Sequence, residues 1–267
     1  MARRTIPVLA LLLAAACGRG HNGTIRASGT IEATQVNVAA KTGGQILRLR
    51  VDEGSEVKPG DTIAVIDHAT LDLQLRQAMA GVAVARAALD NDRRDSERTA
   101  TLFASGSATA KQRDDAAARL AGSQASCDQA AATADLIRKQ IADCSVAAPV
   151  RGTVTVTPFE AGETVPPGAT LATIAQLERV NLMIYVTEKE LARIRPGQRA
   201  TVTIDAFRDK SYGGTVVYVS PAAEFTPKNV QTTEDRVKQV FGVKLQIDNP
   251  ARELKPGLPA DAALIVQ

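Results

Sequence analysis

One block of the sequence occurs twice, and this repeat constrains the fold more than any other feature. The first copy, residues 44–66, reads GQILRLRVDEGSEVKPGDTIAVI, and the second, residues 152–174, reads GTVTVTPFEAGETVPPGATLATI. Aligned without gaps, the copies share Gly44/Gly152, Gly54/Gly162, Val57/Val165, Pro59/Pro167, Gly60/Gly168, Thr62/Thr170, Ala64/Ala172 and Ile66/Ile174. Because glycine and proline fix turns, the two copies are predicted to share a backbone and not merely a composition.

Each copy predicts short strands joined by turns. Leu47, Leu49 and Val51 alternate with polar residues, as in a strand with one buried face. The predicted structural turns contain Gly54, Pro59, Gly60, Gly162, Pro167 and Gly168. A unit of about 25 residues is too small to bury a core by itself. The two copies are therefore expected to interleave into one domain.

The repeat resembles the two halves of a lipoyl/biotinyl-type domain, a flattened β-sandwich with pseudo-two-fold symmetry. We expect the halves to span residues 44–67 and 145–174. In the carrier enzymes of that family, a tight turn between the halves presents a modified lysine. This chain has no lysine between Lys58 and Lys111, which argues against a lipoyl- or biotin-carrying subunit.

The segment between the copies, residues 68–144, predicts a long helical hairpin. It contains no proline and is rich in residues of high helix propensity. A heptad-like seam is predicted at Leu71, Leu75, Ala78, Val82, Ala85 and Leu89, and a second one at Ala117, Leu120, Cys127, Ala131, Ala134 and Ile141. A glycine-containing break near 103–109 separates two helices of about 50 Å each. Such a hairpin fits a spacer or docking rod, and a dimerisation coiled coil is the alternative.

A helical hairpin inserted between two lipoyl-like halves is similar to the HlyD-type periplasmic adaptors, also called membrane fusion proteins. The resemblance covers nearly the whole mature chain. It implies an adaptor that links an inner-membrane transporter to a TolC-type outer-membrane channel, assembled as a ring that is commonly hexameric. Members that use TolC carry Arg, Leu and Ser at the tip, which correspond here to Arg98, Leu102 and Thr109. These residues are expected to contact the channel.

The N-terminus has the pattern of a secretory signal. Arg3 and Arg4 precede a short apolar run that ends at Cys17. The pattern resembles a bacterial lipoprotein signal, residues 1–17, with Cys17 as the lipidated residue and residues 18–23 as a tether. An ordinary signal peptide with an incidental cysteine is the alternative. Lipidation would hold the mature chain at a membrane surface without a transmembrane helix. The sequence does not fix which membrane, and the adaptor resemblance implies a periplasmic chain anchored at the inner membrane.

Residues 24–43 and 175–267 predict a small β-barrel. Strand-like runs occur at 180–186, 200–204, 214–219, 240–247 and 262–266, with a short helix near 188–194. The polar stretch Thr226–Val240 resembles a segment of adaptors that are paired with ABC-type transporters. The end of the chain resembles the C-terminal turn and strand of the adaptor family. A further membrane-proximal domain is therefore expected to be absent or vestigial.

Composition and motifs exclude several other classes. A net charge of +3 is too small to indicate a nucleic-acid partner, and 3% aromatic residues leave few stacking platforms. The sequence offers no arrangement of residues for catalysis, a metal or a cofactor. Cys127 and Cys144 lie about 25 Å apart on a continuous helix, too far to pair. The sequence thus predicts a mainly β protein with an α-helical hairpin that acts as an adaptor, the alternatives being a carrier subunit or a self-associating scaffold lipoprotein.

Overall fold

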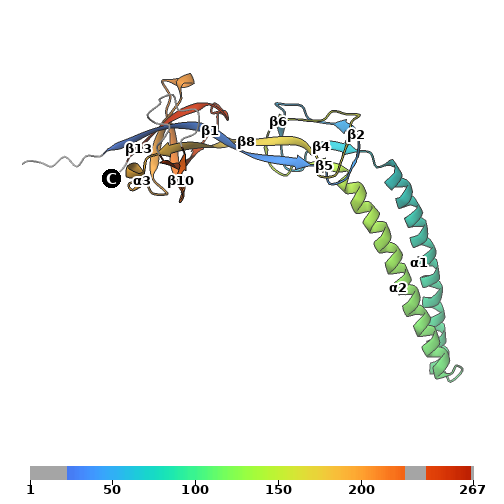
Figure 1. Ribbon diagram of the computed structural model, residues 1–267. Helices are drawn as coiled ribbons and strands as arrows, with labels where there is room; N and C mark the ends of the chain where they lie inside the picture. Colours follow the sequence, from blue (N-terminus) through green and yellow to red (C-terminus); the bar gives the residue numbers. More distant parts are fainter. Residues whose placement is uncertain (1–22, 226–238, 266–267) are drawn as a thin grey trace, which may run out of the picture. The chain divides into compact units, whose positions relative to one another are not determined.

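A computed structural model describes residues 23–225 and 239–265 (Figure 1). The chain divides into two compact units. One comprises residues 33–178, and the other is formed by the residues before 33 and after 178. Two long strands, β1 (Thr24–Ala39) and β8 (Thr170–Val186), contribute residues to both units.

The unit of residues 33–178 contains a β-sandwich built from the repeat. One sheet has the strand order β5-β4-β2-β7, and the other contains β1-β8-β6-β3. The shorter strands are β2 (Gly44–Leu49), β3 (Glu56–Val57), β4 (Thr62–Ile66), β5 (Ser145–Ala147), β6 (Gly152–Val156) and β7 (Thr164–Val165). A shift of 108 positions converts the first half of the repeat into the second. Under the same shift, the end of β1 is equivalent to β5, β2 to β6, β3 to β7 and β4 to β8. The two sheets therefore have equivalent strand orders, and the sandwich has pseudo-two-fold symmetry.

Equivalent hydrogen bonds join the two halves of the sandwich. The amide of Gly54 donates to the carbonyl of Val154 at 2.8 Å, and the equivalent amide of Gly162 donates to Ile46 at 2.8 Å. In the same way, Gly60 donates to Ala148 and Gly168 donates to Ala40. Because each half completes the sheet edges of the other, neither half can form this structure alone.

The sandwich core is filled by equivalent apolar residues from both halves. Its buried members are Val38, Ala40, Ile46, Val51, Val57, Ile63, Ala64, Ile66, Cys144, Val146, Ala148, Val154, Val165, Leu171, Ala172 and Ile174. Val38 and Ala40 lie in the stretch that the sequence assigned to the barrel. The structure instead places residues 33–43 in the sandwich unit, because the end of β1 is the equivalent of β5.

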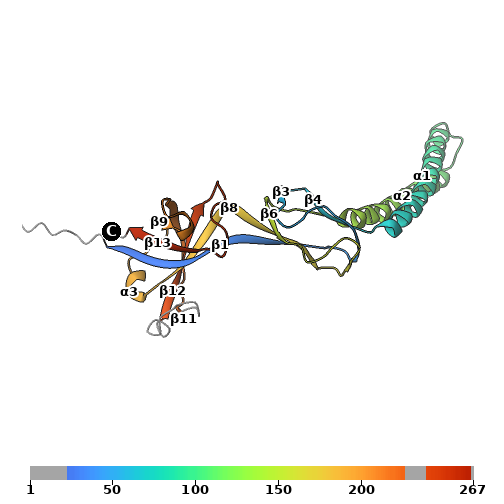
Figure 2. The ribbon, with the colours of Figure 1, turned by 90° about the horizontal axis from the view of Figure 1, so that it is seen from above.

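The helical hairpin consists of α1 (Ala69–Ala104) and α2 (Ala110–Asp143), which lie side by side in both ribbon views (Figures 1 and 2). All six seam residues predicted in α1 are at least half-buried, and Leu89 is buried. In α2 the predicted Ala117 is exposed, whereas Ala116 is buried. The α2 seam therefore begins one residue earlier than expected, and it continues through Leu120, Cys127, Ala134 and Ile141.

The second unit is a closed six-stranded β-barrel. Its strand order is β1-β13-β9-β10-β12-β8, and the pairing of β8 with β12 and β1 closes the ring. The remaining strands are β9 (Arg199–Thr203), β10 (Tyr212–Val219), β12 (Gln239–Asp248) and β13 (Pro259–Ile265), with β11 (Glu224–Phe225) beside β12. A short helix α3 (Glu188–Leu191) and a 3-10 turn, Asp205–Phe207, connect strands. The barrel interior is apolar and includes Leu182, Ile184, Val202, Leu245 and Leu264.

Four Pro-Gly turns have the same geometry, two in the sandwich and two in the barrel. In each turn the glycine has a positive φ, between 86° and 92°, at Gly60, Gly168, Gly197 and Gly257. The residue after each glycine donates a backbone hydrogen bond to the residue before the proline. This is the geometry of a type II turn, in which proline suits the first central position and glycine the second.

Among the described residues, no helix is both long and apolar enough to span a membrane. Cys127 is half-buried in the hairpin seam, and Cys144 is buried directly after α2, where it caps the helix and does not continue it. Both thiols are free.

Candidate functional site: the hairpin tip

The hairpin tip is the short connection between α1 and α2, residues 105–109. Gly106 has a φ of 74°, a backbone conformation that reverses the chain and favours glycine. The carbonyl of Leu102 accepts hydrogen bonds from the amide of Ser107 at 2.8 Å and from the hydroxyl of Ser105 at 2.9 Å. These bonds satisfy a carbonyl that the last turn of α1 would otherwise leave unpaired.

Thr109 is the N-cap of α2. Its hydroxyl accepts a hydrogen bond from the amide of Gln112 at 3.2 Å, and the Gln112 side chain accepts one from the amide of Thr109 at 2.7 Å. This reciprocal pair is a capping box, which satisfies amides that have no partner within the helix. Thr109, which was predicted to contact the channel, therefore also stabilises the start of α2.

Arg98 belongs to a cluster of charges that crosses the hairpin. Its guanidinium pairs with Asp95 one turn earlier in α1, and Asp95 also pairs with Arg119 of α2 at 2.8 Å. Hydrogen bonds from Arg119 and Arg98 lower the pKa of Asp95 below its ordinary value. Two arginines share one carboxylate, so the cluster presents a net positive charge. The Arg98 side chain stays 68% exposed.

A cation–π contact also joins the two helices close to the tip. The guanidinium of Arg113, in α2, lies 4.5 Å from the centre of the Phe103 ring, in the last turn of α1. Arg113 further pairs with its neighbour Asp114 at 2.8 Å. Phe103 is half-buried by this arrangement, whereas the adjacent Leu102 remains 44% exposed.

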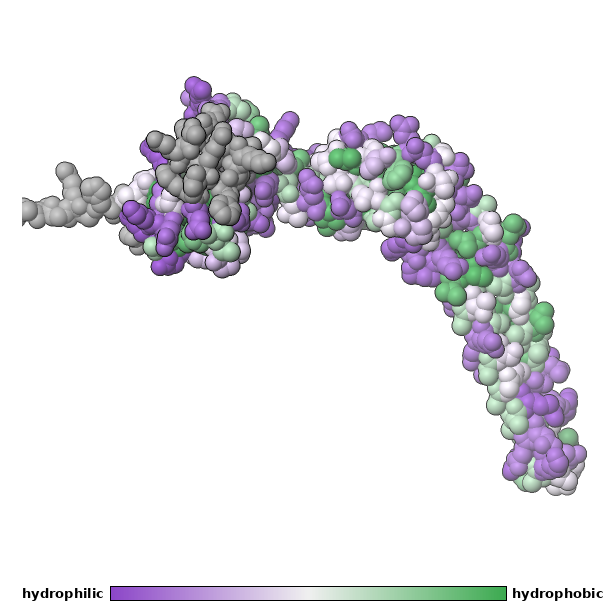
Figure 3. Space-filling view, in the orientation of Figure 1, coloured by the Kyte–Doolittle hydropathy of each residue, from purple (hydrophilic) through white to green (hydrophobic). Residues whose placement is uncertain are grey.

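The end of α1 that leads into the tip therefore presents an exposed leucine, Leu102, and an exposed arginine, Arg98. Within the described part of the chain, no group of three or more His, Cys, Asp or Glu residues could hold a metal ion. The geometry suits docking: Leu102 offers apolar area, and Arg98 offers charge-assisted hydrogen bonds to carboxylates or carbonyls. The surface at this end of the hairpin is largely hydrophilic (Figure 3).

The remaining predicted site residues are the turn residues of the repeat, which lie in the sandwich, and Cys17. Gly54 and Gly162 occupy equivalent turns, with φ of 90° and 98°, and Pro59-Gly60 and Pro167-Gly168 form the two type II turns of the sandwich. None of these turns contributes to the tip. Cys17, the predicted lipidation site, lies outside the described residues.

Arg113 and Arg119 were not among the predicted site residues, although both join the two helices near the tip. The spacing of Asp95 and Arg98 within one helix could have been recognised as an ion pair. The contacts to Arg113 and Arg119 depend on how the two helices align, and the sequence pattern leaves that alignment uncertain by a residue.

A barrel-sandwich domain that is split by a helical hairpin and joined to a small β-barrel defines the class of periplasmic membrane fusion proteins. Residues 34–177 match the family described as "RND MFP, barrel-sandwich hybrid domain", which is more than half of the chain. Residues 182–262 match the "YknX-like beta-barrel domain". The chain therefore belongs to the membrane fusion protein family.

Relatives of the chain carry membrane-protein names. The chain is 30% identical over 288 residues to "UPF0194 membrane protein in asrC 5'region" of Acidithiobacillus ferridurans, an alignment that covers 88% of this chain and 85% of the relative. It is 28% identical to "UPF0194 membrane protein YbhG" of Salmonella gallinarum, with 86% of each chain covered.

Solved structures show the same fold. The MacA-MexA chimeric protein that contains the Pseudomonas aeruginosa MexA α-hairpin domain has a TM-score of 0.65 at 25% identity, covering 91% of this chain and 82% of the chimera. The membrane fusion protein Spr0693 from Streptococcus pneumoniae R6 has a TM-score of 0.68 at 20% identity, covering 90% of this chain and 98% of Spr0693. The latter supports the fold alone.

Proposed function

We propose that this protein is the adaptor of a tripartite export system and links an inner-membrane transporter to a TolC-type outer-membrane channel. The observation that carries the proposal is the tip end of the hairpin, where the last turns of α1 expose Arg98 and Leu102. In this proposal the role is mechanical: the chain positions two partners and performs no chemistry. A carrier function would require a modified lysine at the turn that the hairpin replaces.

Each part of the chain has a role in the proposed assembly. Arg98, Leu102 and Thr109 contact the channel, while the barrel faces the transporter. An ABC-type transporter is favoured because Thr226–Val240 resembles a segment of adaptors with that partner, although nearly all of this segment lies outside the described residues. Cys17 carries the lipid that holds the chain at the inner membrane. The chain assembles with copies of itself, and the family favours a hexameric ring.

The proposal is tested by changing both exposed tip residues together. The double substitution Arg98→Asp and Leu102→Asp replaces the cation and the apolar surface by two anions, so we expect the tagged protein to lose co-purification with a TolC-type channel from detergent-solubilised membranes. Co-purification with the inner-membrane transporter is expected to persist, because the tip does not contact it. Export by a deletion strain should be restored by the wild-type gene and not by the double variant.

The chain offers a closely matched control near the base of the hairpin. Arg138 pairs with Asp135 over three positions, as Arg98 does with Asp95, and Leu136 is 61% exposed. Leu136→Asp combined with Arg138→Asp therefore makes the same chemical change on the same rod away from the tip. Equal loss of the channel in both double variants, or no loss in the tip variant, would overturn the proposed contact. A deletion strain with unchanged export would favour a scaffold lipoprotein.

A further inference from the structure

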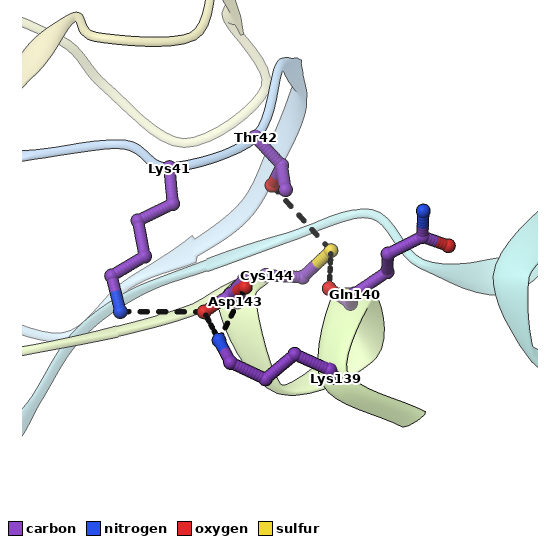
Figure 4. A network of polar contacts seen from close by, with 6 residues as sticks. All are labelled: Lys41, Thr42, Lys139, Gln140, Asp143 and Cys144. Carbon is purple, nitrogen blue, oxygen red and sulfur yellow. Dashed lines mark hydrogen bonds and ion pairs between the residues drawn. The ribbon is translucent and has the colours of Figure 1, made fainter. Parts of the chain in front are cut away.

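The base of the hairpin holds a cluster of charges that the proposed docking function does not use. α2 ends at Asp143, only Cys144 separates it from β5, and the loop after β1 carries Lys41 beside this junction (Figure 4). The Asp143 carboxylate accepts hydrogen bonds from Lys139 at 2.5 and 2.6 Å and from Lys41 at 3.3 Å. One carboxylate thus connects the helix to the β-sandwich.

Asp143 is the last residue of α2, a position where an isolated carboxylate would be unfavourable. The C-terminal end of a helix carries partial negative charge from unpaired carbonyls, which repels an anion. The two ammonium groups reverse this effect: hydrogen bonds from Lys139, and then from Lys41, hold the pKa of Asp143 below its ordinary value. The carboxylate therefore stays ionised at neutral pH and available for pairing.

The two lysines are not equivalent, because they belong to different parts of the unit. Lys139 lies one turn earlier in α2 and moves together with Asp143, whereas Lys41 reaches across from the sandwich. If Lys41 leaves, Asp143 keeps Lys139 as its partner, and the Lys41 side chain, already 72% exposed, is hydrated by the solvent. Separation therefore leaves no charge buried without a partner, which is the expensive outcome for most internal ion pairs.

The junction also holds a buried thiol beside an open groove. The Cys144 thiol is buried, donates to the carbonyl of Gln140 at 3.3 Å and lies 3.6 Å from the hydroxyl of Thr42. Beside it lies a groove of about 260 Å³, lined by Lys41, Asp143 and residues from the end of β1 and from β5. The buried Cys144 holds the end of α2 against the sandwich, and the groove lies between the end of β1 and β5.

We propose that Lys41, Asp143 and Lys139 form a releasable latch that sets the angle between the hairpin and the β-sandwich. With Lys41 bound, the hairpin is held in one orientation. With Lys41 released, the hairpin pivots about Cys144 while Lys139 neutralises Asp143. The latch belongs to this chain alone and operates without any partner of the proposed assembly.

The latch is tested on purified full-length protein by pulsed electron paramagnetic resonance. Spin labels are placed at Lys58→Cys in a sandwich turn and at Ala125→Cys on α2, both exposed positions, in a background in which Cys17 and Cys127 are changed to Ser so that no third label is attached. Cys144 remains because its thiol is buried. We expect Lys41→Gln to broaden and shift the distance distribution, Lys139→Gln to leave it narrow, and Lys41→Arg to restore the narrow distribution.

Salt and a control variant complete the experiment. About 1 M salt, at which the Debye length falls to about 3 Å, should broaden the distribution of the parent protein and leave that of Lys41→Gln unchanged. Arg138→Gln, which breaks an exposed pair within α2, should have no effect. An unchanged distribution in Lys41→Gln would overturn the latch. Equal broadening by Lys139→Gln would also overturn it, since fraying of the helix end would then be the cause.

Discussion

At the scale of single residues, the two glycines that begin the repeat are required by close packing. A Cβ at Gly44 would lie 2.7 Å from Cγ2 of Ile66, and a Cβ at Gly152 would lie 2.6 Å from Cγ2 of the equivalent Ile174. At Gly152 it would also lie 2.5 Å from the carbonyl oxygen of Ala175. In each half of the sandwich, a glycine at the equivalent position therefore allows its strand to pack closely against the equivalent isoleucine.

Gly152→Ala is expected to destabilise the sandwich by about 1–3 kcal/mol, the usual cost of overpacking a core. The carbonyl of Ala175 belongs to the backbone of β8 and cannot rotate away, so a strand must shift. Urea unfolding of the purified protein measures the change. Gly81→Ala in α1 is the control: its Cβ would meet nothing within 4 Å, and it should stabilise the helix by up to about 1 kcal/mol. A neutral Gly152→Ala would contradict this packing.

Tyr212 provides a pH-dependent test in the barrel. Burial and the hydrogen bond to Glu253 raise the pKa of Tyr212 to about 12, so the folded chain holds the phenol proton more tightly than an unfolded chain does. The corresponding stability is complete below the ordinary tyrosine pKa of about 10 and is lost as the pH rises through about 12. Titration of phenolate absorbance should show a step near pH 12.

Two substitutions assign that step. Tyr212→Phe should remove it, and Glu253→Gln should move it to lower pH, because the neutral amide no longer disfavours the phenolate. If the step persisted in Tyr212→Phe, the assignment to this tyrosine would be wrong. Lys210 pairs with the same Glu253 carboxylate, whose pKa it lowers, so Glu253 remains charged throughout the titration.

At this scale the sequence predicted the turns better than the contacts. Gly60 and Gly168 were recognisable because a Pro-Gly pair has few compatible backbones, and both turns have a positive φ at glycine. The pairs Arg119–Asp95, Arg113–Phe103 and Lys41–Asp143 were not predicted. In each pair, the distance between the two residues depends on how the helices align or on the path of a strand. The local sequence pattern predicts neither the helix alignment nor the strand path.

At the scale of the elements, the hairpin was the most predictable part of the chain. Its expected limits, residues 68–144, agree with α1 and α2 to within a residue at each end, because heptad spacing and the Gly106 break are strong local signals. The strand β1 was less predictable. Its end belongs to the sandwich, a placement that the repeat could have shown: Val38, Ala39 and Ala40 match Val146, Ala147 and Ala148.

Thr109→Ala should weaken the start of α2. Loss of the hydroxyl removes one side of the capping box, and such caps contribute about 1 kcal/mol, within a range of about 0.5–2. Hydrogen exchange of the amides near Gln112 should become faster, while exchange in the middle of α2 should not change. Thr109→Ser keeps the acceptor and should behave as the parent protein does. Equal exchange in all three proteins would show that the cap has no effect.

At the scale of the whole molecule, the hairpin is an insertion that the sandwich can be expected to tolerate losing. The amide of Ile66, just before the hairpin, donates to the carbonyl of Cys144, just after it, at 2.8 Å. The ends of the insertion are therefore adjacent, and two glycines could join His68 to Cys144. The solved MacA-MexA chimera, which contains the hairpin domain of another protein, is consistent with such modularity.

Deleting residues 69–143 and inserting two glycines should leave a folded β protein. Circular dichroism should lose most of its helical signal and retain a cooperative β transition, because the paired strands of the sandwich and barrel remain. In the proposed assembly, the shortened protein should still co-purify with the transporter and lose the channel. An aggregated or unfolded product would show that the hairpin is needed to complete the sandwich.

The interleaved repeat also bears on the order in which the chain can fold. The four equivalent hydrogen bonds between the halves join residues that lie 88 to 128 positions apart in the chain, and such distant contacts slow the folding of β proteins. The hairpin forms from local contacts, and helices and short loops form within microseconds. Once it has formed, the end of β4 and the start of β5 are already neighbours. We therefore expect the inserted hairpin, once formed, to shorten the time that the two halves need to meet.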